Sequence, residues 1–131
     1  MDSEYPDGYE PQVPIDDESI PLWVRIEECM RMLDVANRAA KGRGITMVNA
    51  EAEYYTQKAI AAFTLKEEGY PVTFISDVIK GIPEVSKAMT TYHAEEVGYK
   101  NANEAIQIYK LKLRVLNDEQ QRDYEQARRT T

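Results

Sequence analysis

Hydrophobic and polar residues alternate with a helical period over most of the chain, beginning near Pro21. Between Pro21 and Lys41, apolar side chains recur at steps of three and four residues, the spacing of one helix face. That face consists of Leu22, Ile26, Cys29, Leu33, Ala36 and Ala40. The opposite, charged face consists of Arg25, Glu28, Arg31, Asp34 and Arg38. We expect a first helix here, ended by Gly42 and Gly44.

A second helix is predicted after a break at residues 41–48. Thr46 or Asn49 can cap its start, and Gly69 followed by Pro71 predicts its end. The expected core stripe consists of Val48, Ala52, Tyr55, Ala59 and Ala62. Because three of these residues are alanines, we expect a close approach to a neighbouring helix.

Residues 70–81 form a compact connector with two possible structures. Thr73 could cap a two-turn helix that ends at Gly81 and buries Phe74, Ile75, Val78 and Ile79. A β-strand over residues 72–75 is the alternative, because these residue types favour strands. The short helix is preferred, since the sequence contains no second strand pattern for pairing.

The longest predicted helix runs from Pro83 to Arg128. Two series of residues repeat every seven positions along it, as in a heptad seam. The first series is Val85, Tyr92, Tyr99, Ile106 and Leu113, and the second is Ala88, Glu95, Ala102, Tyr109 and Leu116. The apolar pattern weakens after Leu116, so a break at Asn117–Asp118 is possible.

These elements predict an all-α fold, a helical bundle with antiparallel helix pairing and one long C-terminal helix. The second helix is too short to cover the long helix completely. An apolar seam left in water is unfavourable and usually has a partner. We therefore expect a homo-oligomer in which another chain buries Ile106, Tyr109, Leu113 and Leu116.

The net charge of −7 comes from the first 19 residues, which carry seven acidic residues and no basic one. Three prolines also interrupt this segment, which indicates an acidic tail (1–19) before one helical domain (20–131). The tail is a solvated extension, with or without its last residues docked on the body, a flap over a basic surface, or a motif for a partner. The motif candidates are Tyr5, Tyr9, Val13 and Ile15.

Two basic clusters are candidates for binding the phosphates of single-stranded DNA. Arg38, Lys41 and Arg43 lie at the predicted end of the first helix, and Lys110, Lys112 and Arg114 lie on the long helix. Such binding also requires exposed aromatic side chains nearby. Ordinary solvated helix faces are the alternative interpretation of both clusters.

The residues that carry chemistry are too few for an active site, so we expect no enzyme, no metal and no cofactor. His93 is the only histidine, and it precedes Glu96 by three residues, the reverse of the order in helical di-metal sites. We expect Glu95 to contact a tyrosine across the helix pair, such as Tyr55. Cys29, the only cysteine, lies on an apolar face and is expected to be inert.

Residues 50–55 (AEAEYY), 66–73 (KEEGYPVT) and 94–100 (AEEVGYK) resemble small helical proteins of phages and prophages. More loosely, the layout is similar to phage recombination mediators, which are acidic, helical, oligomeric proteins that help load a recombinase on single-stranded DNA. The resemblance implies a self-associating accessory factor in DNA metabolism. The alternative is a structural or regulatory adaptor that uses its tail and long helix. We expect a cytoplasmic protein with no membrane partner.

Overall fold

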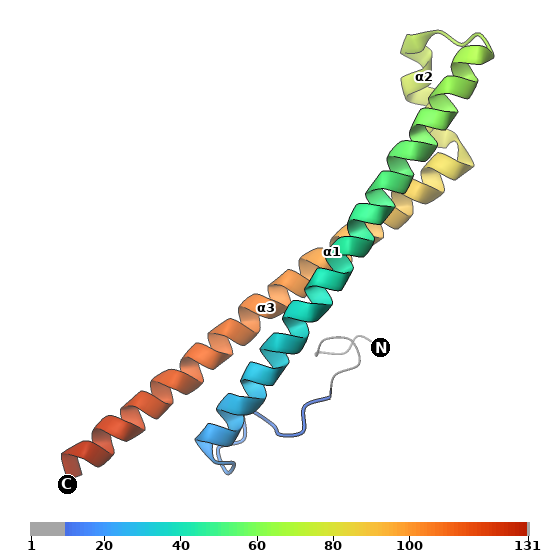
Figure 1. Ribbon diagram of the computed structural model, residues 1–131. Helices are drawn as coiled ribbons and strands as arrows, with labels where there is room; N and C mark the ends of the chain where they lie inside the picture. The colour runs from blue at the N-terminus through green and yellow to red at the C-terminus, as the bar shows by residue number, and fades with distance from the viewer. Residues whose placement is uncertain (1–9, 131) are drawn as a thin grey trace. The chain divides into compact units, whose positions relative to one another are not determined.

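A computed structural model describes residues 10–130. They form two long helices, α1 (Leu22–Glu67) and α3 (Pro83–Thr130), joined by the short helix α2 (Val72–Val78) and a 3-10 turn, η1 (Ile79–Gly81) (Figure 1). No strand occurs among the described residues, so the connector is helical and the alternative of a strand is wrong. The predicted all-α fold with one long C-terminal helix is confirmed.

The predicted break at residues 41–48 is wrong, because α1 continues through Gly42 and Gly44 without interruption. A Cβ atom on Gly44 would lie 3.0 Å from Cε2 of Tyr99 on α3. Gly44 therefore permits a close approach of the Tyr99 ring. A glycine in a helix interior costs about 1 kcal/mol relative to alanine, a penalty that helix packing can outweigh.

The end of α1 follows the sequence prediction. Gly69 has a φ of +89°, the left-handed conformation that favours glycine. The N–H of Gly69 donates to the carbonyl of Lys66, and the N–H of Tyr70 donates to that of Leu65. Pro71, rather than Thr73, occupies the N-cap position of α2. The hydrogen bonds from Gly69 and Tyr70 satisfy carbonyl groups at the end of α1.

Helix α3 is unbroken over 48 residues, so the possible break at Asn117–Asp118 does not occur. All ten predicted seam positions are buried or half-buried. Val85, Ala88, Ile106, Tyr109 and Leu116 are buried. The heptad pattern therefore identified the inward face of α3 correctly.

The chain divides into two compact units, and both long helices contribute to each. The first unit comprises the described residues up to Lys41 together with those from Asn101 onward, and the second comprises Gly42–Lys100. Within each unit the segments of α1 and α3 run antiparallel (Figure 1).

The first unit has its own apolar core, built mainly from α1 and α3. Its buried members are Ile15, Cys29, Met32, Ala36, Ala40, Ile106, Tyr109 and Leu116. Leu113 is half-buried against the same cluster. The expectation that the seam from Ile106 to Leu116 lies beyond the core of a single chain is therefore wrong. These residues pack against the first part of α1 and against Ile15.

The segment before α1 packs on the first unit and buries part of the face that was predicted to be charged and solvated. Arg25 is 5% exposed and Glu28 is fully buried. The backbone N–H of Gln12 donates to Oε1 of Glu28 at 3.1 Å, and Arg31 pairs with Oε2 of Glu28 at 2.8 Å. A buried carboxylate is tolerated only with such partners.

Arg25 holds the same segment through its guanidinium group. Its Nε donates to the carbonyl of Ile20 at 3.0 Å and its Nη1 to that of Ile15 at 3.5 Å. Its Nη2 lies 3.6 Å from a carboxylate oxygen of Glu119 on α3. The last residues of the predicted tail are thus docked. Ile15 belongs to the core and is not available as part of a partner motif, whereas Tyr5 and Tyr9 lie outside the described residues.

The second unit has a core at the end where α2 and η1 connect the long helices. Its buried members are Ala61, Leu65, Ile75, Ile79 and Val85. Ile75 and Ile79 are buried as predicted, Val78 is half-buried, and Phe74 remains 50% exposed.

Candidate protein-interaction surface

The apolar stripe predicted to pack inside the second unit lies largely on its surface. Val48, Ala52, Tyr55 and Ala59 are exposed, and Ala62 is half-buried. A different series faces α3 and the connector, including the half-buried Tyr54 and the buried Ala61 and Leu65. The prediction of the inward face was therefore wrong.

We define the α1 stripe as Ile45, Val48, Ala52, Tyr55, Ala59 and Phe63. Steps of three and four residues place these six side chains along one face of the helix. All six are exposed, and the most exposed large ones are Val48 at 58% and Phe63 at 67%. Single exposed apolar residues are ordinary, whereas an apolar row at this spacing is typical of helix–helix contacts. The α1 stripe is therefore a candidate interaction surface.

Two opposite charges lie along one edge of the α1 stripe. Glu51 and Lys58 are seven residues apart, so they occupy equivalent positions two turns apart on the helix. Nζ of Lys58 lies 5.8 Å from the ring centroid of Tyr54, within the range of a cation–π contact. The other edge carries the uncharged Asn49 and Thr56, which are both exposed.

Aromatic rings connect the stripe to α3. The ring of Tyr54 stacks on that of Tyr55 at 5.3 Å and on that of Tyr92 at 6.0 Å. Desolvation, followed by the negative charges of Glu51 and Glu96, raises the pKa of Tyr92 to about 12. Hydrogen bonding of the neutral phenol, whose single O–H can donate to either Glu96 or Glu51, also contributes to the raised pKa. These contacts restrict the orientations of Tyr55 within the stripe and of Glu51 at its edge.

The predicted tyrosine–carboxylate contact exists with different partners. The carboxylates of Glu51 and Glu96 interact with the phenol of Tyr92, and the contact involves neither Glu95 nor Tyr55. Nδ1 of the exposed His93 lies 3.8 Å from Oε1 of Glu96. Among the described residues, no group of three metal-ligating side chains is close enough to hold an ion.

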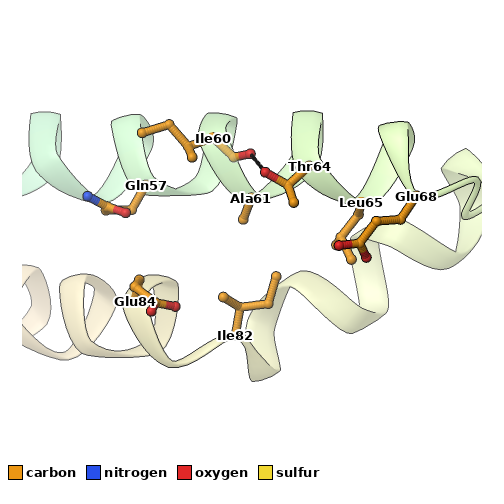
Figure 2. A pocket seen from close by; sticks show the side chains of 8 residues that line it. All are labelled: Gln57, Ile60, Ala61, Thr64, Leu65, Glu68, Ile82 and Glu84. Carbon is orange, nitrogen blue, oxygen red and sulfur yellow. Dashed lines mark hydrogen bonds between the residues drawn. The ribbon is translucent and has the colours of Figure 1, made fainter.

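A second apolar surface of the same unit is the groove drawn in Figure 2, with a volume of about 360 Å³. Ala61 and Leu65 point from α1 toward Ile82 on the facing segment (Figure 2). Gln57, Glu68 and Glu84 supply the polar groups of its lining. Compared with the continuous α1 stripe, this groove is a small and open surface.

The three basic residues at the predicted end of the first helix differ in their surroundings. Arg38 pairs with Asp34 at 2.6 Å in the first unit, where Lys41 is exposed. Arg43 belongs to the second unit and is half-buried, and a Cβ on Gly98 would lie 2.9 Å from its Nη1 atom.

The three basic residues on α3 also differ in exposure and in the helix face on which they lie. Lys110 and Arg114 are exposed and one turn apart, so they share a face. Lys112 is half-buried and lines a small pocket with Val13 and Asp16 of the N-terminal segment. The predicted cluster on α3 is therefore reduced to two exposed cations.

The first unit also exposes apolar side chains. Ile108, Leu111 and Val115 follow one another at helical spacing on α3 and are 52–60% exposed. Trp23 and Met30 are exposed on α1. This row is shorter than the α1 stripe, and nothing in its spacing indicates a particular partner.

Comparison with family models, curated proteins and solved structures gives no match for this chain. In the part of the chain that the structure describes, no helix combines the length and apolar character that crossing a bilayer requires.

Proposed function

We propose that the protein is a non-enzymatic adaptor that binds a helix of another polypeptide chain along the α1 stripe. The observation that carries the proposal is the unbroken row of exposed apolar side chains from Ile45 to Phe63. Helix-in-groove and helix–helix recognition use such rows, with anchors at steps of three and four residues. The fixed orientation of Tyr55, stacked on Tyr54, reduces the ordering cost of binding.

The surroundings of Cys29 and His93, the two side chains that could support catalysis, also favour a non-enzymatic function. The thiol of Cys29 is fully buried, and desolvation raises its pKa, so its reactive thiolate form is disfavoured. His93 is exposed and lies on the surface of α3 beside Glu96. Neither residue lies beside the groove of Figure 2.

Photo-cross-linking in cells that naturally carry the protein tests the proposal. A photoreactive phenylalanine analogue replaces Tyr55 in the stripe or, as a matched control, the exposed Glu53 on another face of the same helix. We expect a covalent adduct with a protein from position 55 and none from position 53. No protein adduct from position 55, or equal adducts from both positions, would contradict the proposal.

A role in DNA metabolism, expected from the resemblance to phage proteins, is a second proposal. It is supported by the shared face of Lys110 and Arg114 on α3. Binding through these cations would weaken steeply with salt, because phosphate contacts release counterions. A gel shift with single-stranded DNA across a salt series, comparing the wild type with Lys110→Glu/Arg114→Glu, distinguishes this role from a purely protein-binding one.

A further inference from the structure

We propose that the α1 stripe binds the α1 stripe of a second copy of this chain in antiparallel orientation. The local two-fold axis passes between residues 53 and 54. This inference rests on the proposed function, that the stripe binds a helix, and it names the partner. A two-fold contact requires a surface that is complementary to itself. If one residue of the first copy contacts a second residue of the other copy, the same contact also occurs with the two copies exchanged.

The sizes of the stripe residues satisfy that requirement. In the antiparallel register, Val48 lies opposite Ala59 of the second copy. Ile45 lies opposite Ala62, which flanks the α1 stripe and is half-buried against the inner cluster of the second unit. At the centre, Ala52 lies opposite Tyr55 of the second copy. Each layer thus joins one large side chain with one alanine, which fills space evenly.

A parallel pair in register would stack Tyr55 on Tyr55 and Ala52 on Ala52. Large and small layers would then alternate, leaving gaps beside the alanines and crowding at the tyrosines. The size pattern from Ile45 to Ala62 is therefore self-complementary in the antiparallel orientation alone. This contact covers 18 residues, or about 27 Å of helix at 1.5 Å per residue.

Charge supports the same register independently of size. Equivalent edges of two antiparallel helices face each other, so Glu51 lies near Lys58 of the second copy, and Lys58 lies near its Glu51. Two ion pairs form for each dimer. A parallel pair would instead bring this edge against the uncharged edge that carries Asn49 and Thr56.

Both charged side chains are already oriented within one chain. The carboxylate of Glu51 lies within hydrogen-bonding range of the Tyr92 phenol, and the ammonium group of Lys58 lies over the ring of Tyr54. Each contact limits the conformations that the charge can adopt. The entropy lost on forming the two ion pairs is smaller for that reason.

Charge reversal tests the pairing by sedimentation equilibrium on the full chain. Glu51→Lys and Lys58→Glu each replace two attractions per dimer with two repulsions, so each should weaken association by about tenfold. An equimolar mixture of the two variants should associate at least as tightly as the wild type, because every facing pair is then attractive. Glu53→Lys changes the charge equally and should not weaken association in this way.

Thermal melting followed by circular dichroism shows whether each variant is folded. The double variant Glu51→Lys/Lys58→Glu, which restores both pairs, keeps the test valid if a single variant is unstable. A wild type that is monomeric at every concentration tested, or variants whose mixture gains nothing, would overturn the inference. An adduct from position 55 with a different protein would overturn self-pairing and leave the adaptor proposal standing, whereas no adduct would contradict the proposed function itself.

Discussion

At the scale of single residues, two glycines two positions apart in α1 have different roles. A Cβ on Gly42 would meet nothing within 4 Å, whereas one on Gly44 would lie 3.0 Å from the Tyr99 ring. The sequence suggested the same role for both, a helix stop. The structure indicates that Gly44 is required for packing and that Gly42 is not.

The two glycines give a matched pair of substitutions. Gly42→Ala should raise the free energy of unfolding by about 0.5–1 kcal/mol, because alanine favours the helix and the site is open. Gly44→Ala should lack this gain, because the new methyl group presses on Tyr99. Urea denaturation of both variants measures the difference. An equal gain in both would show that Tyr99 does not pack on Gly44.

Tyr92 provides a pH-dependent test of the second unit. Its folded pKa of about 12 exceeds the value near 10 for an unperturbed tyrosine, so folding favours the neutral phenol. The stabilisation is complete below pH 10 and is lost as the pH rises toward 12. A spectrophotometric titration of the nine tyrosines should contain a late phase that disappears in Tyr92→Phe. Titration of all tyrosines near pH 10 would contradict the cluster.

At the scale of elements, α3 was predictable from sequence, whereas α1 was predictable only in its first apolar face and its end at Gly69. Helix α3 carries one strong pair of heptad series, and all ten positions point inward. Between Ile45 and Leu65, by contrast, α1 carries two apolar rows, one facing α3 and the connector and one facing solvent. Periodicity identifies both rows and cannot choose between them, so the outward row was mistaken for the core.

The burial of Arg25 and Glu28 depends on contacts distant in sequence. Their spacing matches a solvated face, whereas the docked N-terminal segment binds both and Glu119 on α3 also lies beside Arg25. Local patterns therefore could not reveal this part of the first unit. The same limit applied to the seam from Ile106 to Leu116, whose partners lie on α1 and at Ile15.

The docked segment should contribute to the stability of the first unit. Ile15 is 6% exposed, so Ile15→Ala should lower the free energy of unfolding by about 2–3 kcal/mol. Glu18→Ala, at an exposed position of the same segment, should change it by less than about 0.5 kcal/mol. Chemical denaturation of both variants measures this. Equal stability of the two would show that the segment does not pack on the unit.

At the scale of the whole molecule, we expect assembly through the surface of α1 and not through the seam of α3. Ile106, Tyr109 and Leu116 are already buried within one chain, so they offer little apolar area to a second one. The row from Ile45 to Phe63 remains available. We therefore expect the α1 helices of two copies to pair antiparallel through this row.

Pulsed electron–electron double resonance between nitroxide labels directly measures whether the two α1 helices are antiparallel in the dimer. Single cysteines at the exposed positions Glu53 and Glu67 carry the label, and buried Cys29 stays unlabelled. The antiparallel dimer predicts a separation of roughly 20 Å or less at position 53, beside the two-fold axis. At position 67 it predicts about 40 Å, because the two labels are 27 helical rises apart. Short separations at both positions, or no coupling at either, would contradict it.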